Sequence, residues 1–245
     1  MGAAPARADR LDLQAHVQSF WTTVQDSPSL RERLFGRGDR REETAVARFT
    51  TQGGPDFVLD QSGARTLLRY DGSDEIWVLR PTAGVRGDIY YRNDVGEVVL
   101  RATRLGGLTL YTASNPGGLA CALDRGAGRL ELPEQDIRFL LRHFAREAMR
   151  AGESMRGSFE ITARAVEPDS SDVFGDAATV AVDGIVRLAQ TASGRERLAS
   201  LRTMLIVVGS APGVRRDGAT LIVTVNPRLG AAGRPSSARV MRALS

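Results

Sequence analysis

The chain has 245 residues, of which 42% are hydrophobic and 25% are charged, and its formal net charge at pH 7 is +4. These values are typical of folded globular proteins and exclude a chain that is disordered throughout. The sequence contains no lysine, which excludes Schiff-base enzymes, Walker A loops and Ser-x-x-Lys hydrolases. The single cysteine and the two histidines exclude an intramolecular disulfide and a zinc site rich in these residues.

The first eight residues leave the destination of the protein open. Ala6-Arg7-Ala8 has the small-x-small form of a signal-peptidase site, but no apolar stretch precedes it. The segment is therefore either a disordered, alanine-rich tail or the remnant of a signal peptide that begins upstream. A truncated signal peptide would favour the periplasm, and its absence would favour the cytoplasm. No run approaches 18 apolar residues, so we expect no transmembrane segment.

Residues 1–43 are expected to form an N-terminal tail and helices. Apolar residues recur at spacings of three and four in residues 11–24, which predicts a helix with one apolar face: Leu13, Val17, Phe20, Trp21 and Val24. Residues 28–35 predict a second short helix, and the polar residues 36–43 predict a linker.

Residues 44–130 are expected to form a β-hairpin-rich domain. Strands are predicted at residues 44–50, 56–60, 65–70, 75–80, 88–92, 97–103 and 108–112. Glycine, aspartate and asparagine between these strands are typical of tight turns. Short strands at roughly ten-residue spacing indicate an antiparallel β-meander, as a sandwich or a partly open barrel. The glycine- and alanine-rich residues 115–129 are expected to close this half.

Residues 131–245 are expected to form an α+β domain, either with a core of its own or with one core shared with the β half. Pro133 opens a predicted helix that ends at Gly152. The later predicted elements are a strand at 159–166, helices at 174–191 and 195–202, strands at 204–208 and 221–225, and a final helix that Ser236 or Ser237 caps. The two apolar strands are expected in a sheet buried on both faces, with a hairpin connection between them. The predicted fold class is α+β: an N-terminal helix, the meander, then a mixed α/β rear half.

Several polar segments were considered as sites, and each has a simpler structural interpretation. Arg86-Gly87-Asp88 matches an adhesion tripeptide, but it is expected to form a turn. Two acidic groups offer oxygen ligands for a hard cation, but neither has the EF-hand spacing and both are expected to be turns or caps: Asp71, Asp74 and Glu75, and Asp169 to Asp172. The segment Gly209 to Gly213 offers a place for a phosphate, although no helix follows it.

The histidines and the cysteine are interpreted in the same way. His143 is a candidate general base, but we expect it to cover the core. His16 is expected on the surface, in a one-turn pair with Asp12. Cys121 lies among apolar residues, which favours packing over reactivity. We therefore assign no catalytic, metal-binding or cofactor-binding residue from the sequence, and no cofactor.

Parts of the sequence resemble an uncharacterised family of conserved alphaproteobacterial proteins with a domain of unknown function. The resemblance extends from about Ala45 onward and is carried by Phe57–Asp60, Glu75–Pro81, Arg86–Asp88, Arg92–Asp94, Leu100–Leu110, Thr224–Pro227 and Ala232–Ser237. The family has no assigned activity, so the resemblance transfers no catalytic residue. It implies a bacterial housekeeping or envelope setting.

Two functional hypotheses follow. The first is a non-enzymatic binding or structural protein, with a protein partner or self-association, that uses a surface of tyrosines and arginines: Tyr90, Tyr91, Arg92, Arg101, Arg104 and Tyr111. The alternative is a hydrolase-type enzyme that uses carboxylates or a serine. No nucleic-acid partner is expected, because the sequence has no basic cluster with interleaved aromatic residues.

Overall fold

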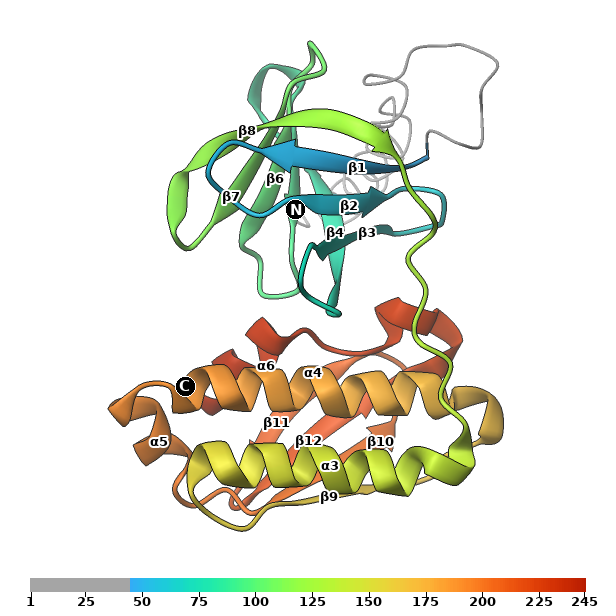
Figure 1. Cartoon of the computed structure of the whole chain (residues 1–245), viewed down its shortest axis with the longest axis vertical. Coiled ribbons are helices and arrows are strands. Elements are labelled where there is room, and N and C mark those ends of the chain that lie inside the picture. Colours follow the sequence, from blue (N-terminus) through green and yellow to red (C-terminus); the bar gives the residue numbers. More distant parts are fainter. Residues whose placement is uncertain (1–44) are drawn as a thin grey trace, which may run out of the picture.

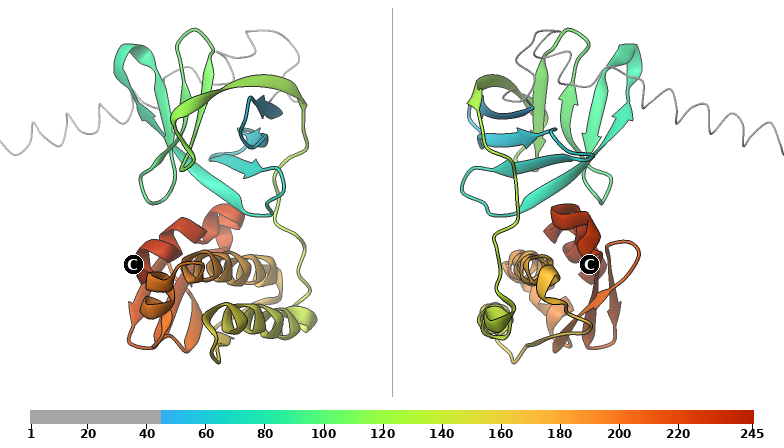
Figure 2. Two further views of the ribbon diagram at one scale, coloured as in Figure 1. Left: turned by 60° about the vertical axis from the view of Figure 1, so that its left-hand side comes forward. Right: turned by 90° about the vertical axis from the view of Figure 1, so that its right-hand side faces the viewer.

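The computed structural model describes residues 45–245, which form a β-barrel stacked on an α/β unit (Figure 1). A single extended connection, from the end of β8 to the start of α3, joins the two parts (Figures 1 and 2). Within residues 45–245, no helix has both the length and the hydrophobicity needed to cross a membrane. The expected tail, helices and linker of residues 1–43 lie outside the described residues, as does His16.

The barrel contains eight antiparallel strands, each paired with the next along the chain. They are β1 (Val46–Thr51), β2 (Phe57–Asp60), β3 (Thr66–Tyr70), β4 (Ile76–Ala83), β5 (Ile89–Arg92), β6 (Val98–Ala102), β7 (Leu108–Thr112) and β8 (Asn115–Gly126). The tight turns place Gly72, Gly96 and Gly106 at φ values of 76°, 88° and 91°, which glycine adopts without strain. A short 3₁₀ helix, η1 (Val85–Gly87), connects β4 to β5.

The predicted fold class is wrong, because the β half is a closed barrel and neither a sandwich nor a partly open barrel. The segment expected to be a glycine- and alanine-rich closing loop is the longest strand, β8, which pairs with both β7 and β1. The small residues of β8 give no alternation of apolar and polar side chains, so the sequence pattern does not predict this strand. Its pairing with β1 removes the two free edges that an open sheet would expose. The predicted N-terminal helix lies outside the described residues.

Large apolar side chains fill the barrel interior, as expected for eight strands. Those buried completely, or nearly so, include Phe57, Leu68, Leu79, Leu100 and Leu110, and the rings of Phe49 and Phe57 stack with centroids 5.4 Å apart. The strand β4 is covered on both faces. Leu79 lies in the barrel core, whereas Ile76 packs outside it in a second cluster with Leu130 and Ala231.

The α/β unit has a four-stranded sheet in the order β11-β12-β10-β9. The strands β9 (Glu160–Ala163), β10 (Thr203–Val208) and β12 (Thr220–Val225) are parallel, and β11 (Gly213–Asp217) is an antiparallel edge strand. The expected hairpin between residues 204–208 and 221–225 is therefore wrong, since these strands are parallel neighbours and the hairpin joins β11 to β12. The edge strand was missed because its sequence is polar, with Arg215, Arg216 and Asp217.

Helices form the rest of this unit and enclose its core (Figure 2). They are α3 (Ile137–Met155), α4 (Ser171–Ala189), α5 (Ala192–Leu198) and α6 (Ser237–Leu244), with the 3₁₀ helices η2 (Pro168–Ser170) and η3 (Pro227–Gly233). Phe144 and Phe174 pack with Met204 and Val223 of the sheet. Buried and partly exposed residues alternate along β10 and β12, so the expectation of burial on both faces is wrong for these strands.

Candidate functional site

A cavity of about 160 Å³ lies between the barrel and the α/β unit, and we call it the junction cavity. Both units supply its lining: Arg65, Val78, Arg80 and Asp94 from the barrel, and Ser210, Ala211, Pro212, Leu229, Ala232, Arg234, Ser236 and Arg239 from the α/β unit. A water molecule occupies about 30 Å³ in the liquid, and sites for drug-sized ligands measure about 300–1,000 Å³. The junction cavity therefore has room for a small molecule or for one group of a larger ligand.

The lower wall is built at the carboxyl ends of two parallel strands. Ser210, Ala211 and Pro212 follow β10, and Leu229 and Ala232 lie in η3, which follows β12. In open α/β sheets, ligands bind in the crevice outside the carboxyl ends of the strands. The junction cavity has this position, and the barrel covers it from above.

Asn226 fixes the two connections to each other. Its Nδ2 donates to the carbonyl oxygen of Ser210 over 2.9 Å, and its backbone N–H donates to Gly233 O over 2.7 Å. A Cβ atom at Gly233 would lie 2.1 Å from the carbonyl oxygen of Asn226, so this close backbone approach requires glycine. Both bonds are local constraints that hold the lower wall in one conformation.

Three arginines of the lining have side chains without a polar partner within residues 45–245: Arg65, Arg80 and Arg239. Arg65 lies in the turn before β3, Arg80 on β4 and Arg239 in the first turn of α6. By contrast, Arg48 of the barrel pairs with the carboxylates of Asp56 and Asp124. The cavity therefore gathers guanidinium groups whose donors are unused.

Arg234 is the buried cation of the site. Its side chain is 1% exposed and its Nε donates to the carboxylate of Asp176 on α4. The Nη2 atom of Arg234 is buried and has no hydrogen-bond partner within residues 45–245. Nearly all buried polar groups in native proteins are paired, and an unpaired one is commonly satisfied by a water or an ion.

Two barrel carboxylates hold the N-terminus of α6 and so fix the upper wall against the lower one. Asp94 accepts hydrogen bonds from the backbone N–H and the hydroxyl of Ser236. Glu75 accepts from Ser237 in the same way, over 2.9 Å and 2.7 Å. Negative charge at a helix N-terminus is stabilising, because unpaired N–H groups and the helix dipole meet there. We call these two pairs the junction contacts.

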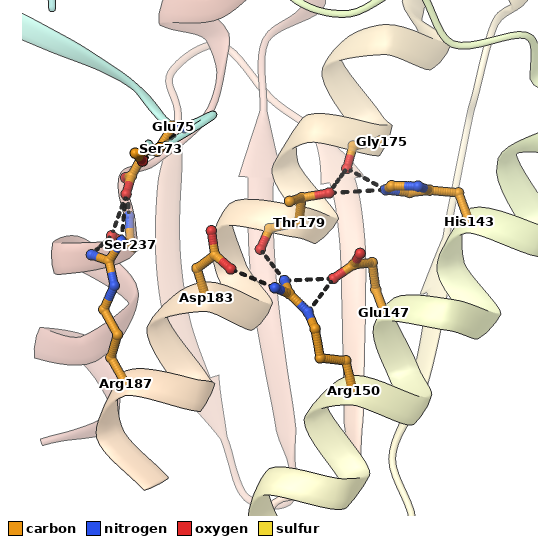
Figure 3. A network of polar contacts seen from close by, with 10 residues as sticks. All are labelled: Ser73, Glu75, His143, Glu147, Arg150, Gly175, Thr179, Asp183, Arg187 and Ser237. Carbon is orange, nitrogen blue, oxygen red and sulfur yellow. Dashed lines mark hydrogen bonds and ion pairs between the residues drawn. The ribbon is translucent and has the colours of Figure 1, made fainter. Parts of the chain in front are cut away.

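Glu75 is completely buried, and Arg187 of α4 reaches it over 3.3 Å (Figure 3). Burial raises the pKa of the Glu75 carboxyl, although the hydrogen bonds from Ser237 and the charges of Arg234 and Arg187 act in the opposite direction. The sequence grouped Glu75 with Asp71 and Asp74 as a candidate cation site. The fold separates them, since Asp71 forms an ion pair with Arg48. Among the described residues, no cluster of three or more metal-ligating side chains occurs.

His143 lies between α3 and α4 and is not part of the junction cavity. Its Nε2 atom is 3.0 Å from the Thr179 hydroxyl and 3.1 Å from the Gly175 carbonyl oxygen (Figure 3). Two turns further on, Arg150 forms ion pairs with Glu147 of its own helix and with Asp183 of α4. These contacts join α3 to α4, and they give His143 neither an orienting carboxylate nor a neighbouring serine.

The other segments that the sequence singled out have structural roles. Asp88 of the Arg86-Gly87-Asp88 turn is buried and forms an ion pair with Arg101. Cys121 is partly buried in β8, and burial raises the pKa of its thiol to about 11, which makes it a poor nucleophile. Asp169 to Asp172 form η2 and the start of α4, where Ser170 caps the turn.

The predicted surface of tyrosines and arginines is not one surface. Tyr91 belongs to the buried barrel core, where its hydroxyl accepts a hydrogen bond from Gln61. Tyr90 and Arg101 instead lie together on the outside, with the guanidinium 5.9 Å from the ring centre. The sequence pattern could not separate them, because consecutive residues of a strand point to opposite faces.

Sequence reasoning found one part of the junction cavity and missed the rest. The segment Gly209 to Gly213, considered for a phosphate, supplies three residues of its lining. The four arginines were missed because Arg65 and Arg80 are far from Arg234 and Arg239 in the sequence, and arginine is common throughout this lysine-free chain. The only sequence feature that indicates the cavity is the position of Ser210 to Pro212 directly after a buried strand.

Comparison with known proteins identifies the family but no function. No curated protein and no solved structure matches the chain significantly. A family model described as a domain of unknown function, DUF4908, matches residues 29–244. This match covers all but the last of the residues that the structure describes, including both walls of the junction cavity. The chain therefore belongs to the DUF4908 family.

Proposed function

We propose that this protein is a non-enzymatic binding protein that holds a small ligand in the junction cavity. The observation that carries this proposal is the position of the cavity, at the carboxyl ends of β10 and β12 and under the barrel. Residues of both units line the cavity and could contact the ligand. A ligand bound there would add contacts between the barrel and the α/β unit. The same proposal therefore includes a structural role, in which the ligand stabilises the arrangement of the two units.

The hydrolase alternative has less support from the residues of the cavity. Two of its three acidic and hydroxyl groups, Asp94 and Ser236, are bonded to each other, and the Ser236 oxygen also accepts the backbone N–H of Arg239. Both groups thus serve as a cap of α6. A nucleophilic serine needs a base positioned to take its proton, and His143 lies elsewhere.

A substitution that fills the cavity tests the proposal. Thermal unfolding of the full chain is measured with panels of phosphates, carboxylates, sugars, amino acids and nucleotides. A ligand that binds only the native state raises the unfolding midpoint. We expect one of these classes to stabilise the wild type and Ala145→Phe, which adds a ring to an exposed position on α3. Ala211→Phe, in the cavity wall, should abolish the effect; a panel without any stabilising compound contradicts the proposal.

The setting of the protein is a second, separate part of the proposal. We propose a bacterial protein of alphaproteobacteria that acts at the cell envelope, because of the resemblance given above and the Ala6-Arg7-Ala8 sequence. Fractionation of cells that express the natural open reading frame tests it. Recovery in the periplasmic fraction supports the envelope setting, and recovery in the cytoplasm contradicts it.

A further inference from the structure

The charge of the junction cavity narrows the class of ligand that it accepts. Its lining contains four arginines and one carboxylate, a formal excess of three positive charges. A lining of this charge repels cations and favours anions over neutral molecules, because hydrogen bonds between two charged groups are stronger. We propose that the ligand is a phosphate or a phosphorylated compound, an inference that rests on the proposed function of this same cavity.

The first argument is the number of unused donors. The guanidinium groups of Arg65, Arg80 and Arg239 make no polar contact within residues 45–245, and Arg234 has a buried, unpaired Nη2. A guanidinium group presents its N–H donors in a planar fork that matches the oxygens of phosphates and carboxylates. Hydrogen bonds between two charged groups are roughly twice as strong as those between neutral ones. An oxyanion is the ligand that would satisfy these donors.

The second argument distinguishes a phosphate from a carboxylate. The arginines come from opposite walls, Arg65 and Arg80 from the barrel and Arg234 and Arg239 from the segment around the start of α6. A carboxylate has two oxygens in one plane and one negative charge. A phosphate has oxygens directed to several sides and up to two charges near neutral pH, so it can accept from both walls at once.

The third argument is the incomplete pairing of the buried guanidinium group of Arg234. Arg234 has one carboxylate partner, Asp176, through Nε, and the burial of a charge is costly unless it is fully paired. A second anion beside Arg234 would complete its pairing. A buried arginine would then share one anion with the more exposed arginines of the cavity wall.

Isothermal titration calorimetry of the full chain with inorganic phosphate, pyrophosphate and acetate, at constant ionic strength, tests the inference. We expect saturable binding of phosphate or pyrophosphate, at least about tenfold tighter than that of acetate. Arg80→Gln and Arg239→Gln should each weaken this binding about tenfold, because each removes one charge-assisted contact. Arg104→Gln, on an exposed barrel turn outside the cavity, should leave it unchanged.

A variant of the buried arginine adds a test that does not depend on net charge. Arg234→Lys keeps the positive charge beside Asp176 but removes the planar fork of donors. It should weaken phosphate binding while its thermal midpoint shows that the protein remains folded. If it unfolds, the Arg80→Gln and Arg239→Gln variants decide the result.

The outcomes separate this inference from the proposed function. If acetate binds as tightly as phosphate, or if Arg104→Gln weakens phosphate binding as much as Arg80→Gln, the phosphate inference is wrong. If phosphates do not bind but another compound stabilises the protein and Ala211→Phe blocks it, the cavity is a binding site for a different ligand class. If nothing binds, both proposals fail.

Discussion

At the scale of single residues, Glu75 shows how the junction depends on a buried charge. Its carboxylate has no exposed surface and accepts hydrogen bonds from the N-terminus of α6. The same burial that raises its pKa makes its ionised form costly. Burial of the Glu75 carboxylate therefore costs free energy, and its hydrogen bonds attach the N-terminus of α6 to the barrel.

The pH dependence of stability tests this description of Glu75. Because its pKa is raised in the folded state, that state holds the proton more tightly than the unfolded chain, whose ordinary value is about 4.5. The stability that Glu75 contributes is full below the unfolded pKa and is lost as pH rises through the folded pKa. The free energy of unfolding of the wild type, relative to Glu75→Gln, should therefore fall as pH rises above about 4.5.

Urea-induced unfolding of both proteins over a pH series measures this difference. Glu134→Gln, at an exposed position before α3, serves as the matched control. A wild type that gains stability over Glu75→Gln as pH rises would show that burial does not dominate at this carboxyl.

The sequence is least informative about the partners of single residues. Glu75 was grouped with its neighbours Asp71 and Asp74, because a chain pattern shows only what is adjacent. Its actual partner, Ser237, lies 162 residues away, and the arginines of the cavity likewise come from both halves of the chain. Local patterns specify elements, whereas the partners of polar side chains depend on how those elements pack.

At the scale of elements, the sequence predicted more, and the failures have physical causes. Apolar periodicity located the strands and helices that bury large side chains, such as β4 and α4. It missed β8, whose glycines and alanines carry no apolar alternation, and β11, an edge strand with a polar sequence. Closure of the barrel depends on β8, so one missed strand changed the fold class.

Packing of α4 against α6 offers a prediction at this scale. A Cβ atom at Gly184 of α4 would lie 2.8 Å from the backbone oxygen of Ser237 and 3.0 Å from Val240. The helix propensity of alanine favours Gly184→Ala by about 1 kcal/mol, but the added atom meets a backbone that cannot move aside. We expect a net loss of about 1–3 kcal/mol in the free energy of unfolding.

Gly175→Ala, in the same helix, is the matched control. Its Cβ atom would lie 3.2 Å from the side chain of Gln135, which can move by changing its rotamer. This variant should be neutral or stabilising by up to about 1 kcal/mol. Urea-induced unfolding of the two variants measures both values, and equal effects would contradict the packing of α6 on α4.

At the scale of the whole molecule, the question is whether the barrel and the α/β unit unfold together. Each has its own core, and a third cluster lies between them, with Ile76 and Val58 from the barrel and Ala231 from η3. Asp60 adds a buried bond to the backbone N–H of Leu130 in the connection. We propose two domains, residues 44–130 and 131–245, that the junction contacts and this cluster join into one cooperative unit.

Two spectroscopic probes test the proposal of one cooperative unit. Trp77 lies on β4, so its fluorescence in a Trp21→Phe background reports on the barrel, whereas helical circular dichroism reports mainly on α3 to α6. Coincident transitions are expected when the whole structure unfolds in one step.

A variant at the junction adds a second test. Ser237→Ala removes the hydroxyl group that donates a hydrogen bond to Glu75. The loss of this bond costs about 1–3 kcal/mol at the junction and should separate the two transitions. Ser193→Ala, exposed on α5, should keep them together, and separate transitions in the Trp21→Phe background itself would show that the two domains unfold independently.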